Sequence, residues 1–274
     1  MTRSSGAFHD FEHAGWERAA SQYDRAFGEL TAQSVEPLLD AANAAPGVQL
    51  LDVACGPGYV AAAASRRGSL AVGIDFSAAM VEFASRLYPR LSFRLGDAEN
   101  LDLPEHSVDA VVMNFGMLHL EHPERAISEA FRVLRPGGRY AFSVWDVPER
   151  AIGFGIILNA IQRNGRMDVG LPPGPPFFRF SDPEESRRTL IDAGFVNAQT
   201  LHVPQIWKLQ SGEEILATFR TAAVRTAALL NAQTPTVLSK IKEDVITASE
   251  AHRRGTTILL PMPSVLTSAL KPAK

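Results

Sequence analysis

The chain has 274 residues, of which 46% are hydrophobic, and its formal net charge is −3 at pH 7. This length and apolar content exclude a disordered protein and allow one sizeable core with an elaboration, or two small domains. The acidic balance argues against a nucleic-acid partner, no stretch approaches the roughly 20 apolar residues of a membrane helix, and a single cysteine excludes an internal disulfide framework.

The residues before the first expected strand are predicted to be helical. Residues 1–6 lack the apolar region of a signal peptide, so we expect a cytoplasmic protein. From about residue 10 to residue 45, apolar side chains recur at helical spacing and predict one or two helices.

A glycine-rich turn then separates a strand from a helix. A mostly apolar run over residues 50–53 predicts a buried strand, Gly-Pro-Gly follows it, and an alanine-rich helix is expected over residues 61–67. Glycines let the backbone approach a ligand closely, and the N-terminus of a helix presents free N–H groups. This junction therefore predicts a ligand site. The lone Cys55 beside it has no neighbouring Cys or His ligand pair, so we expect no metal there.

Strands and helices alternate from this point. We expect strands over residues 69–75, 91–95, 108–113 and 139–145, helices over 77–87 and 123–134, and a turn over 135–138. Such alternation predicts a mostly parallel, doubly wound sheet, in which ligands bind beyond the carboxyl ends of the strands. Five polar residues fall at these strand ends: Asp52, Asp75, Asp97, Asn114 and Asp146.

The residues after about 147 are expected to form an elaboration of this core. The expected elements are a helix within residues 148–163, a stiff loop with exposed aromatic side chains over 170–178, a helix over 180–193, an extended segment over 196–209 interrupted at Pro204, helices over 212–231 and 235–254, and a final strand over 257–268. The loop over residues 170–178 is long enough to act as a lid.

Five motifs in this order resemble those of class I S-adenosylmethionine-dependent methyltransferases, in particular the small-molecule group similar to the quinone-biosynthesis C-methyltransferases. The motifs are LLDVACGPGYV, VGIDFSAAMVEFA, GDAENLDLP, DAVVMNFGMLHL and LRPGGRYAFSVW. The resemblance implies a Rossmann-like, doubly wound, seven-stranded sheet, mostly parallel with an antiparallel last strand, together with N-terminal helices and a helical cap inserted near the C-terminus. It divides the chain into a cofactor-binding core, residues 1–146, 181–209 and 256–274 with the N-terminal helices over 10–45, and a cap, residues 147–180 and 210–255.

The resemblance also implies S-adenosylmethionine as cofactor and S-adenosylhomocysteine as its product. Asp52 would orient the amino group of the cofactor directly or through water, and Tyr23 would cap its carboxylate. The loop that would pass under its methionine part consists of Ala54, Cys55, Gly56, Pro57 and Gly58. Ala54 departs from the glycine that many members have there, so the loop must differ slightly, since alanine adopts a positive φ less freely.

The other end of the cofactor falls, by the same resemblance, on the next strands. Asp75 would bind the ribose hydroxyls and Asp97 the exocyclic amine of adenine, while Asn114 and Phe115 would border the sulfonium. The further residues implied on these walls are Phe76, Ser77, Met80, Ala98 and Glu99.

Methyl transfer by in-line displacement requires two partners to be oriented and needs no metal. His119 is the candidate base, because histidine titrates near neutrality; packing is its alternative role. Candidate acceptor residues are Trp16, Met117, Trp145, Phe154, Phe177, Phe178 and Trp207. They predict a small, hydrophobic or aromatic acceptor, although core packing can explain each of them singly.

Two other functions stay open. A non-catalytic module would bind S-adenosylmethionine without an acceptor pocket. The second is a nicotinamide-dependent dehydrogenase, because residues 56–61 also satisfy the dinucleotide-binding pattern G-x-G-x-x-A. Two observations weigh against it: a long helical segment precedes the sheet, and the sequence has no Tyr-x-x-x-Lys pair for hydride chemistry. We expect a monomer or homodimer that acts on a small molecule, without nucleic acid or a membrane span.

Overall fold

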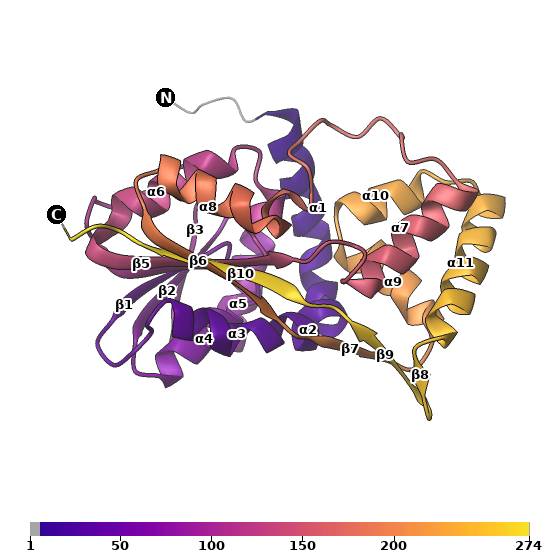
Figure 1. Cartoon of the computed structure of the whole chain (residues 1–274), viewed down its shortest axis with the longest axis horizontal. Coiled ribbons are helices and arrows are strands. Elements are labelled where there is room, and N and C mark those ends of the chain that lie inside the picture. The colour runs from indigo at the N-terminus through magenta and orange to yellow at the C-terminus, as the bar shows by residue number, and fades with distance from the viewer. Residues whose placement is uncertain (1–5, 274) are drawn as a thin grey trace.

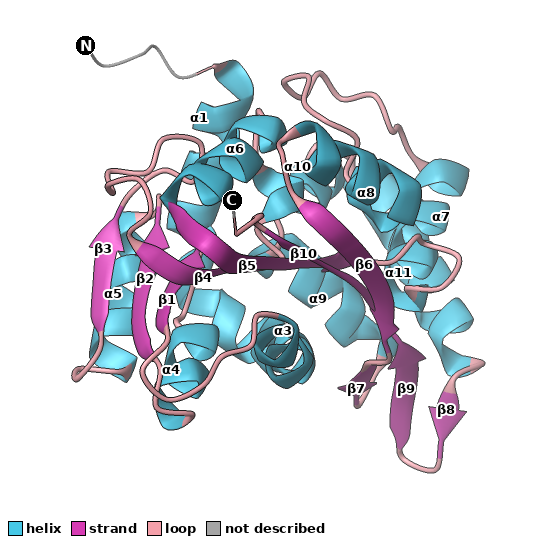
Figure 2. Ribbon diagram, turned by 60° about the vertical axis from the view of Figure 1, so that its left-hand side comes forward, coloured by secondary structure: helices cyan, strands magenta, loops and turns pink. Residues whose placement is uncertain are grey.

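A seven-stranded sheet forms the centre of the structure, a computed structural model that describes residues 6–273 (Figures 1 and 2). Its strands, in the order β3-β2-β1-β4-β5-β10-β6, are β3 (Ser92–Leu95), β2 (Leu70–Asp75), β1 (Gln49–Val53), β4 (Val108–Asn114), β5 (Leu134–Trp145), β10 (Ser264–Leu270) and β6 (Val196–Val203). The first five run parallel, and β10 is antiparallel to both of its neighbours. The predicted doubly wound sheet with an antiparallel last strand is confirmed.

Helices cover both faces of this sheet, which is why its central strands are buried along most of their length. Figure 2 shows α3 (Val35–Ala41) and α4 (Tyr59–Arg66) on one face, and α6 (Pro123–Val133) and α8 (Pro183–Asp192) on the other. A further crossover helix, α5 (Ala78–Leu87), begins after Ser77, whose hydroxyl accepts the Met80 N–H as an N-cap.

The N-terminal segment is one nearly continuous helical run. It comprises α1 (Ala7–Tyr23), a π-helical turn η1 (Asp24–Gly28), α2 (Glu29–Thr31), the short 3-10 turn η2 (Ala32–Ser34) and α3. Helix α1 contacts α5 of the sheet part and α9 (Gly212–Ala222) of the cap, and Figure 1 shows it standing between the two. The π turn contains Phe27 and lies between Tyr23 and Thr31, and all three residues line the pocket described below, a frequent setting for such turns.

The cap consists of four helices, three of which contact a small second sheet. Three of the helices, α7 (Ile152–Asn164), α9 and α11 (Pro235–Glu250), pack against one another, and α10 (Arg225–Asn231) packs on α9. The second sheet joins β7 (Ile206–Leu209), β9 (Thr257–Pro261) and β8 (Arg253–Arg254). No helix in the described part of the chain is both long and apolar enough to cross a membrane.

Several expected boundaries are wrong. The helix predicted over 212–231 breaks into α9 and α10, because Ala223 is extended. The strand predicted over 257–268 is two strands in different sheets, since β9 ends at Pro261 and β10 begins at Ser264. The turn predicted over 135–138 lies inside β5, where the pairing with β4 shifts register.

The aromatic side chains of the loop over residues 170–178 also differ from expectation. Phe177 and Phe178 are half-buried, not exposed, because both pack against Phe154 of the cap helix α7.

Candidate active site

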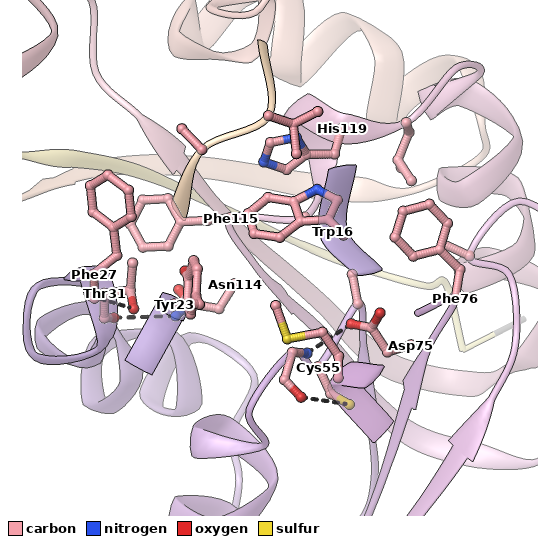
Figure 3. A pocket seen from close by; sticks show the side chains of 18 of the residues that line it. Trp16, Tyr23, Phe27, Thr31, Cys55, Asp75, Phe76, Asn114, Phe115 and His119 are labelled. Atoms are coloured by element: carbon pink, nitrogen blue, oxygen red, sulfur yellow. Dashed lines mark hydrogen bonds between the residues drawn. The ribbon is translucent and has the colours of Figure 1, made fainter. Parts of the chain in front are cut away.

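A large pocket opens beyond the carboxyl ends of β1, β2 and β4, where the sheet meets α1 and the cap (Figure 3). It encloses about 1250 Å³, including the part that is open to solvent. Among residues 6–273 no group of three or more His, Cys, Asp and Glu side chains could hold a metal ion.

One end of the pocket is built around Asp75 and the glycine loop. Asp75 is 5% exposed; its Oδ2 accepts the Gly56 N–H at 2.8 Å and its Oδ1 accepts the Ser77 N–H at 2.9 Å. Burial raises the pKa of Asp75 to about 6, against the effect of these two N–H groups. A Cβ added at Gly56 would meet no atom within 4 Å, so the loop leaves open space along the pocket wall.

The rest of the loop is held by its own constraints. Ala54 lines the pocket with φ +53°, a conformation that is strained for alanine, so the loop has a positive φ at this position without a glycine. Cys55 also lines the pocket, but burial, Asp75 and Asp52 raise the pKa of its thiol well above the usual value, so it is a poor nucleophile. Gly58 lies outside the pocket wall and begins α4 with φ +84°.

Asp52 is fully buried below the loop and does not line the pocket. Its Oδ2 accepts the Ala61 N–H at 2.9 Å, which caps α4, while its Oδ1 has no hydrogen-bond partner among the described residues. Burial raises the pKa of this carboxyl to about 8. Of the two predicted modes, direct contact with a ligand and contact through a bridging water, this position favours the second.

A second group of predicted residues lines the wall beyond Asp75. It comprises Phe76, Met80, Asp97, Ala98 and Glu99. His9 of α1 joins them although its position in the sequence gave little reason to expect it there: its ring lies edge-on to Phe76, and its Nε2 is 3.6 Å from Asp97 Oδ2. Neither ring nitrogen of His9 makes a hydrogen bond to a described residue.

The end of β4 is tied to the N-terminal helices. Asn114 Oδ1 accepts the Ser143 hydroxyl at 2.5 Å, and its Nδ2 donates to the Thr31 carbonyl at 3.2 Å. Phe115 follows with φ +59°, held by its N–H donating to the Ser143 carbonyl at 3.0 Å, and its ring stacks on Trp145 at 4.1 Å. Strained backbone at Ala54 and Phe115 therefore marks both sides of the pocket floor.

The other end of the pocket is walled by aromatic rings. Seven rings contact one another in a closed series, which we call the aromatic circuit: Trp16–Tyr23 (5.6 Å between centroids), Tyr23–Phe27 (6.1 Å), Phe27–Trp145 (6.3 Å), Trp145–Phe154 (5.6 Å), Phe154–Phe177 (5.5 Å), Phe177–His119 (6.0 Å) and His119–Trp16 (4.7 Å). All seven line the pocket. Figure 3 shows Phe27 and Thr31 on one side, Asp75 and Phe76 on the other, and Trp16 with His119 between them.

His119 is joined to two charged residues that sequence reasoning missed. Its Nδ1 lies 2.9 Å from Glu12 Oε2, and Arg225 Nε donates to Glu12 Oε1 at 2.8 Å. Glu12 falls between Trp16 and His9 at helical spacing, so the helical face was a usable signal for Glu12 and His9. Arg225 gave no such signal, because it lies 213 residues from Glu12.

Some predicted site residues fall outside the pocket wall. Besides Asp52 and Gly58, these are Ser77, Met117, Phe178, Trp207 and the strand-end Asp146. Each has another contact: Ser77 caps α5, Met117 and Trp207 are buried in the core, Phe178 packs on Phe177 at 4.9 Å, and Asp146 pairs with His202 at 2.9 Å. Asp75, Asp97 and Asn114 are thus the strand-end residues that the fold brings to one pocket.

Comparison with known proteins gives matches that centre on the sheet. Residues 51–142 match the family described as methyltransferase domain. A demethylmenaquinone methyltransferase from Renibacterium salmoninarum is 35% identical over 111 residues, 40% of this chain and 47% of that protein. A malonyl-[acyl-carrier protein] O-methyltransferase from Pectobacterium atrosepticum is 36% identical over 126 residues, 46% of this chain and 49% of that protein. The chain thus spans about half the length of these relatives.

The fold has counterparts among solved structures. A phosphoethanolamine N-methyltransferase from Haemonchus contortus, in complex with phosphomonomethylethanolamine and S-adenosylhomocysteine, has a TM-score of 0.58 and 17% identity. The match covers 99% of this chain and 61% of that one. At this identity the similarity concerns the fold.

Proposed function

We propose that this chain is a class I S-adenosylmethionine-dependent methyltransferase and that it transfers a methyl group from S-adenosylmethionine to a small hydrophobic or aromatic acceptor. The domain match over residues 51–142 and the fold support this proposal. S-adenosylhomocysteine would be the second product. The observation that carries this proposal is a single pocket with buried and half-buried carboxylates at one end and the aromatic circuit at the other. The two relatives and the solved structure above are named for different acceptors, so the proposal takes the acceptor from the pocket and not from any of them.

The residues present fit the cofactor. The open space over Gly56 suits a ligand that lies against the backbone, and the Asp75 carboxylate on the same wall can accept the ribose hydroxyls. Asp97 on the same wall can accept a hydrogen bond from the exocyclic amine of adenine, and the ring of His9 lies beside it. Tyr23 and the loop around Ala54 would hold the methionine part.

When bound, the cofactor supplies an electrophilic methyl group on a sulfonium. The chain's own contribution is orientation, because in-line displacement needs both partners in a near-attack geometry. Asn114 and Phe115 would border the reacting centre, and the rings of the aromatic circuit would hold a flat acceptor against it and exclude water. His119 faces this space and would take a proton from the acceptor.

The proposed division of labour follows the two ends of the pocket. The sheet part, with the N-terminal helices, would bind the cofactor, and the cap would set the acceptor. This assignment is supported by the acceptor end, which takes Phe154 from α7, Phe177 from the loop after α7 and Arg225 from α10.

Binding and transfer can be tested separately. Calorimetry with S-adenosylhomocysteine should show binding that Asp75→Ala weakens by at least tenfold, while Glu82→Gln, at an exposed ion pair on α5, leaves it unchanged. Radiolabelled S-adenosylmethionine should then transfer its methyl group to members of a panel of phenols, quinols, aromatic amines and thiols. Tight binding without transfer to any of them would identify a non-catalytic module, and binding of a nicotinamide cofactor in place of S-adenosylhomocysteine would identify a dehydrogenase.

A further inference from the structure

We propose that Glu12 is the positioning residue of His119: it holds the imidazole in the tautomer that accepts the acceptor's proton, and Arg225 of the cap keeps Glu12 ready for that task. The inference rests on the proposed function. It concerns three segments that are distant in sequence, namely α1, the 3-10 turn η3 (Met117–His119) after β4, and α10.

Glu12 is a carboxylate with no access to water. It is 0% exposed, and each of its oxygens has one nitrogen partner, His119 Nδ1 at 2.9 Å on Oε2 and Arg225 Nε at 2.8 Å on Oε1. Burial alone would favour the neutral acid, but His119 and Arg225 outweigh it and hold the pKa of Glu12 below its usual value. Glu12 is therefore ionised at neutral pH.

Arg225 already balances this charge and is fixed in place. Its Nη1 donates to the Pro175 carbonyl at 2.8 Å, its Nη2 donates to the Leu118 carbonyl at 2.7 Å, and its guanidinium lies 4.4 Å from the centroid of the Phe8 ring. Since the guanidinium supplies the positive charge, the buried carboxylate does not need a charged histidine. An imidazole that carries one proton, on Nδ1, is enough to form the second bond to Glu12.

The tautomer of His119 follows from its partner. An ionised carboxylate has no proton to give, so the 2.9 Å contact requires the proton on Nδ1. Nε2 then carries the lone pair, and among the described residues the recorded hydrogen bond of the ring is the one from Nδ1 to Glu12. The ring lines the pocket between Trp16 and Phe177, beside the space assigned to the acceptor.

The chemistry that this arrangement supports balances as follows. The acceptor's proton passes to Nε2 of His119, and the electron pair that it leaves forms the new bond to the methyl carbon. The bond from that carbon to sulfur breaks with its pair on sulfur. The imidazolium that results lies 2.9 Å from the Glu12 carboxylate, whose charge was fixed before the reaction began.

The charged groups facing His119 are few. Glu12 reaches it from α1, and Arg225 reaches Glu12 from α10. The nearby Glu121 carboxylate accepts the Gly6 N–H instead. Glu12 is thus the carboxylate that contacts the His119 imidazole.

The test compares Glu12→Gln in two backgrounds. With the best acceptor from the panel above, E12Q should lower kcat by about 10- to 100-fold, with little change in the KM of the acceptor. In the His119→Asn background, E12Q should cause no further loss of kcat. Glu82→Gln, which neutralises an exposed carboxylate, is the matched control.

A second measurement does not depend on activity. Nitrogen NMR of the imidazole should show His119 with its proton on Nδ1 in the unmodified protein, and E12Q should shift the population toward the Nε2–H form. Equal losses of kcat from E12Q with and without His119, or a tautomer that E12Q does not change, would overturn the inference and leave the proposed function standing. Absence of methyl transfer from the unmodified protein would overturn the proposed function, and the inference with it.

Discussion

Asp75 is the residue through which the glycine loop and the second strand act as one site. Its two oxygens hold the N–H groups of Gly56 and Ser77, so the same carboxylate that would bind a ribose also fixes the loop beneath it. The sequence predicted this acid and its place, because a strand followed by a glycine turn and a second strand ending in Asp brings the two together in any parallel unit. It did not predict the burial that raises the pKa of Asp75.

This raised pKa predicts pH-dependent binding. Ribose hydroxyls donate best to an ionised carboxylate, and the pKa of Asp75 is about 6. Affinity for S-adenosylhomocysteine should therefore rise as the pH passes upward through this value, by about tenfold between about pH 5 and about pH 7.5. Calorimetry at these two pH values measures the change. Asp75→Asn should bind weakly with most of the dependence removed; a full tenfold change in this variant would assign the effect to another group.

Gly58 and Gly47 allow a matched test of packing around the loop. Both have positive φ, +84° and +81°, but a Cβ at Gly58 would lie 2.6 Å from the Phe93 ring, whereas one at Gly47 meets no atom within 4 Å. Both alanine variants should lose about 1 kcal/mol from backbone strain, and Gly58→Ala should lose at least a further ~1 kcal/mol from overpacking. Urea unfolding gives both values. Equal losses would mean that Phe93 moves aside without cost.

At the scale of elements, the sequence predicted the helix and strand ends that a capping residue or a proline marks. Ser77 begins α5 as expected, and Pro204 separates β6 from β7. The break between β9 and β10 had a signal that was not used, since prolines 261 and 263 cannot both continue a central strand. The break between α9 and α10 had none: no Gly or Pro occurs there, and Val224 instead approaches α1 at Gly15, where an added Cβ would lie 2.4 Å from its side chain.

Arg225, the next residue, also joins α10 to α1 by its hydrogen bond to Glu12. The same side chain holds the loop over residues 170–178 by donating to the Pro175 carbonyl. Arg225→Gln should release this loop, because three hydrogen bonds to three different segments are weakened at once. Hydrogen–deuterium exchange should become at least several-fold faster over residues 170–178. Arg220→Gln, at an exposed arginine of the same cap bonded to Asn231, is the control. Unchanged exchange in the loop would show that Phe177 and Phe178 suffice to hold it.

At the scale of the whole molecule, sheet and cap differ in how far the sequence determines them. The sheet follows from alternating buried strands and helices, which is a short-range pattern, and three of five strand-end polar residues met in one pocket as expected. The aromatic circuit draws on α1, η1, η3, β5, α7 and the loop after α7, so its closure depends on tertiary contacts that no local spacing encodes. The single aromatic residues could be proposed, but their arrangement could not.

The pH dependence of stability should reflect the buried acids below the pocket. Asp52 has a pKa of about 8 in the folded protein, above its usual value of 3.8, so between these values the folded state binds more protons than the unfolded state. The free energy of unfolding should therefore fall as the pH rises, by on the order of 1 kcal/mol per pH unit from this residue. Asp52→Asn removes that contribution, so urea unfolding at about pH 5, 6 and 7 should show the variant gaining stability relative to the unmodified protein at each step.

Asp109 supplies the control for this comparison. Although burial opposes its ionisation, the Gln49 N–H and Arg135 hold its pKa below the usual value, so it stays ionised throughout that range. Asp109→Asn should lower stability by the same amount at each pH, because neither state changes its protonation there. If Asp52→Asn behaves in this parallel way instead of diverging, then Asp52 is ionised in the folded protein. Its Oδ1, which lacks a partner among the described residues, must in that case be solvated from the pocket side, as contact with a ligand through water requires.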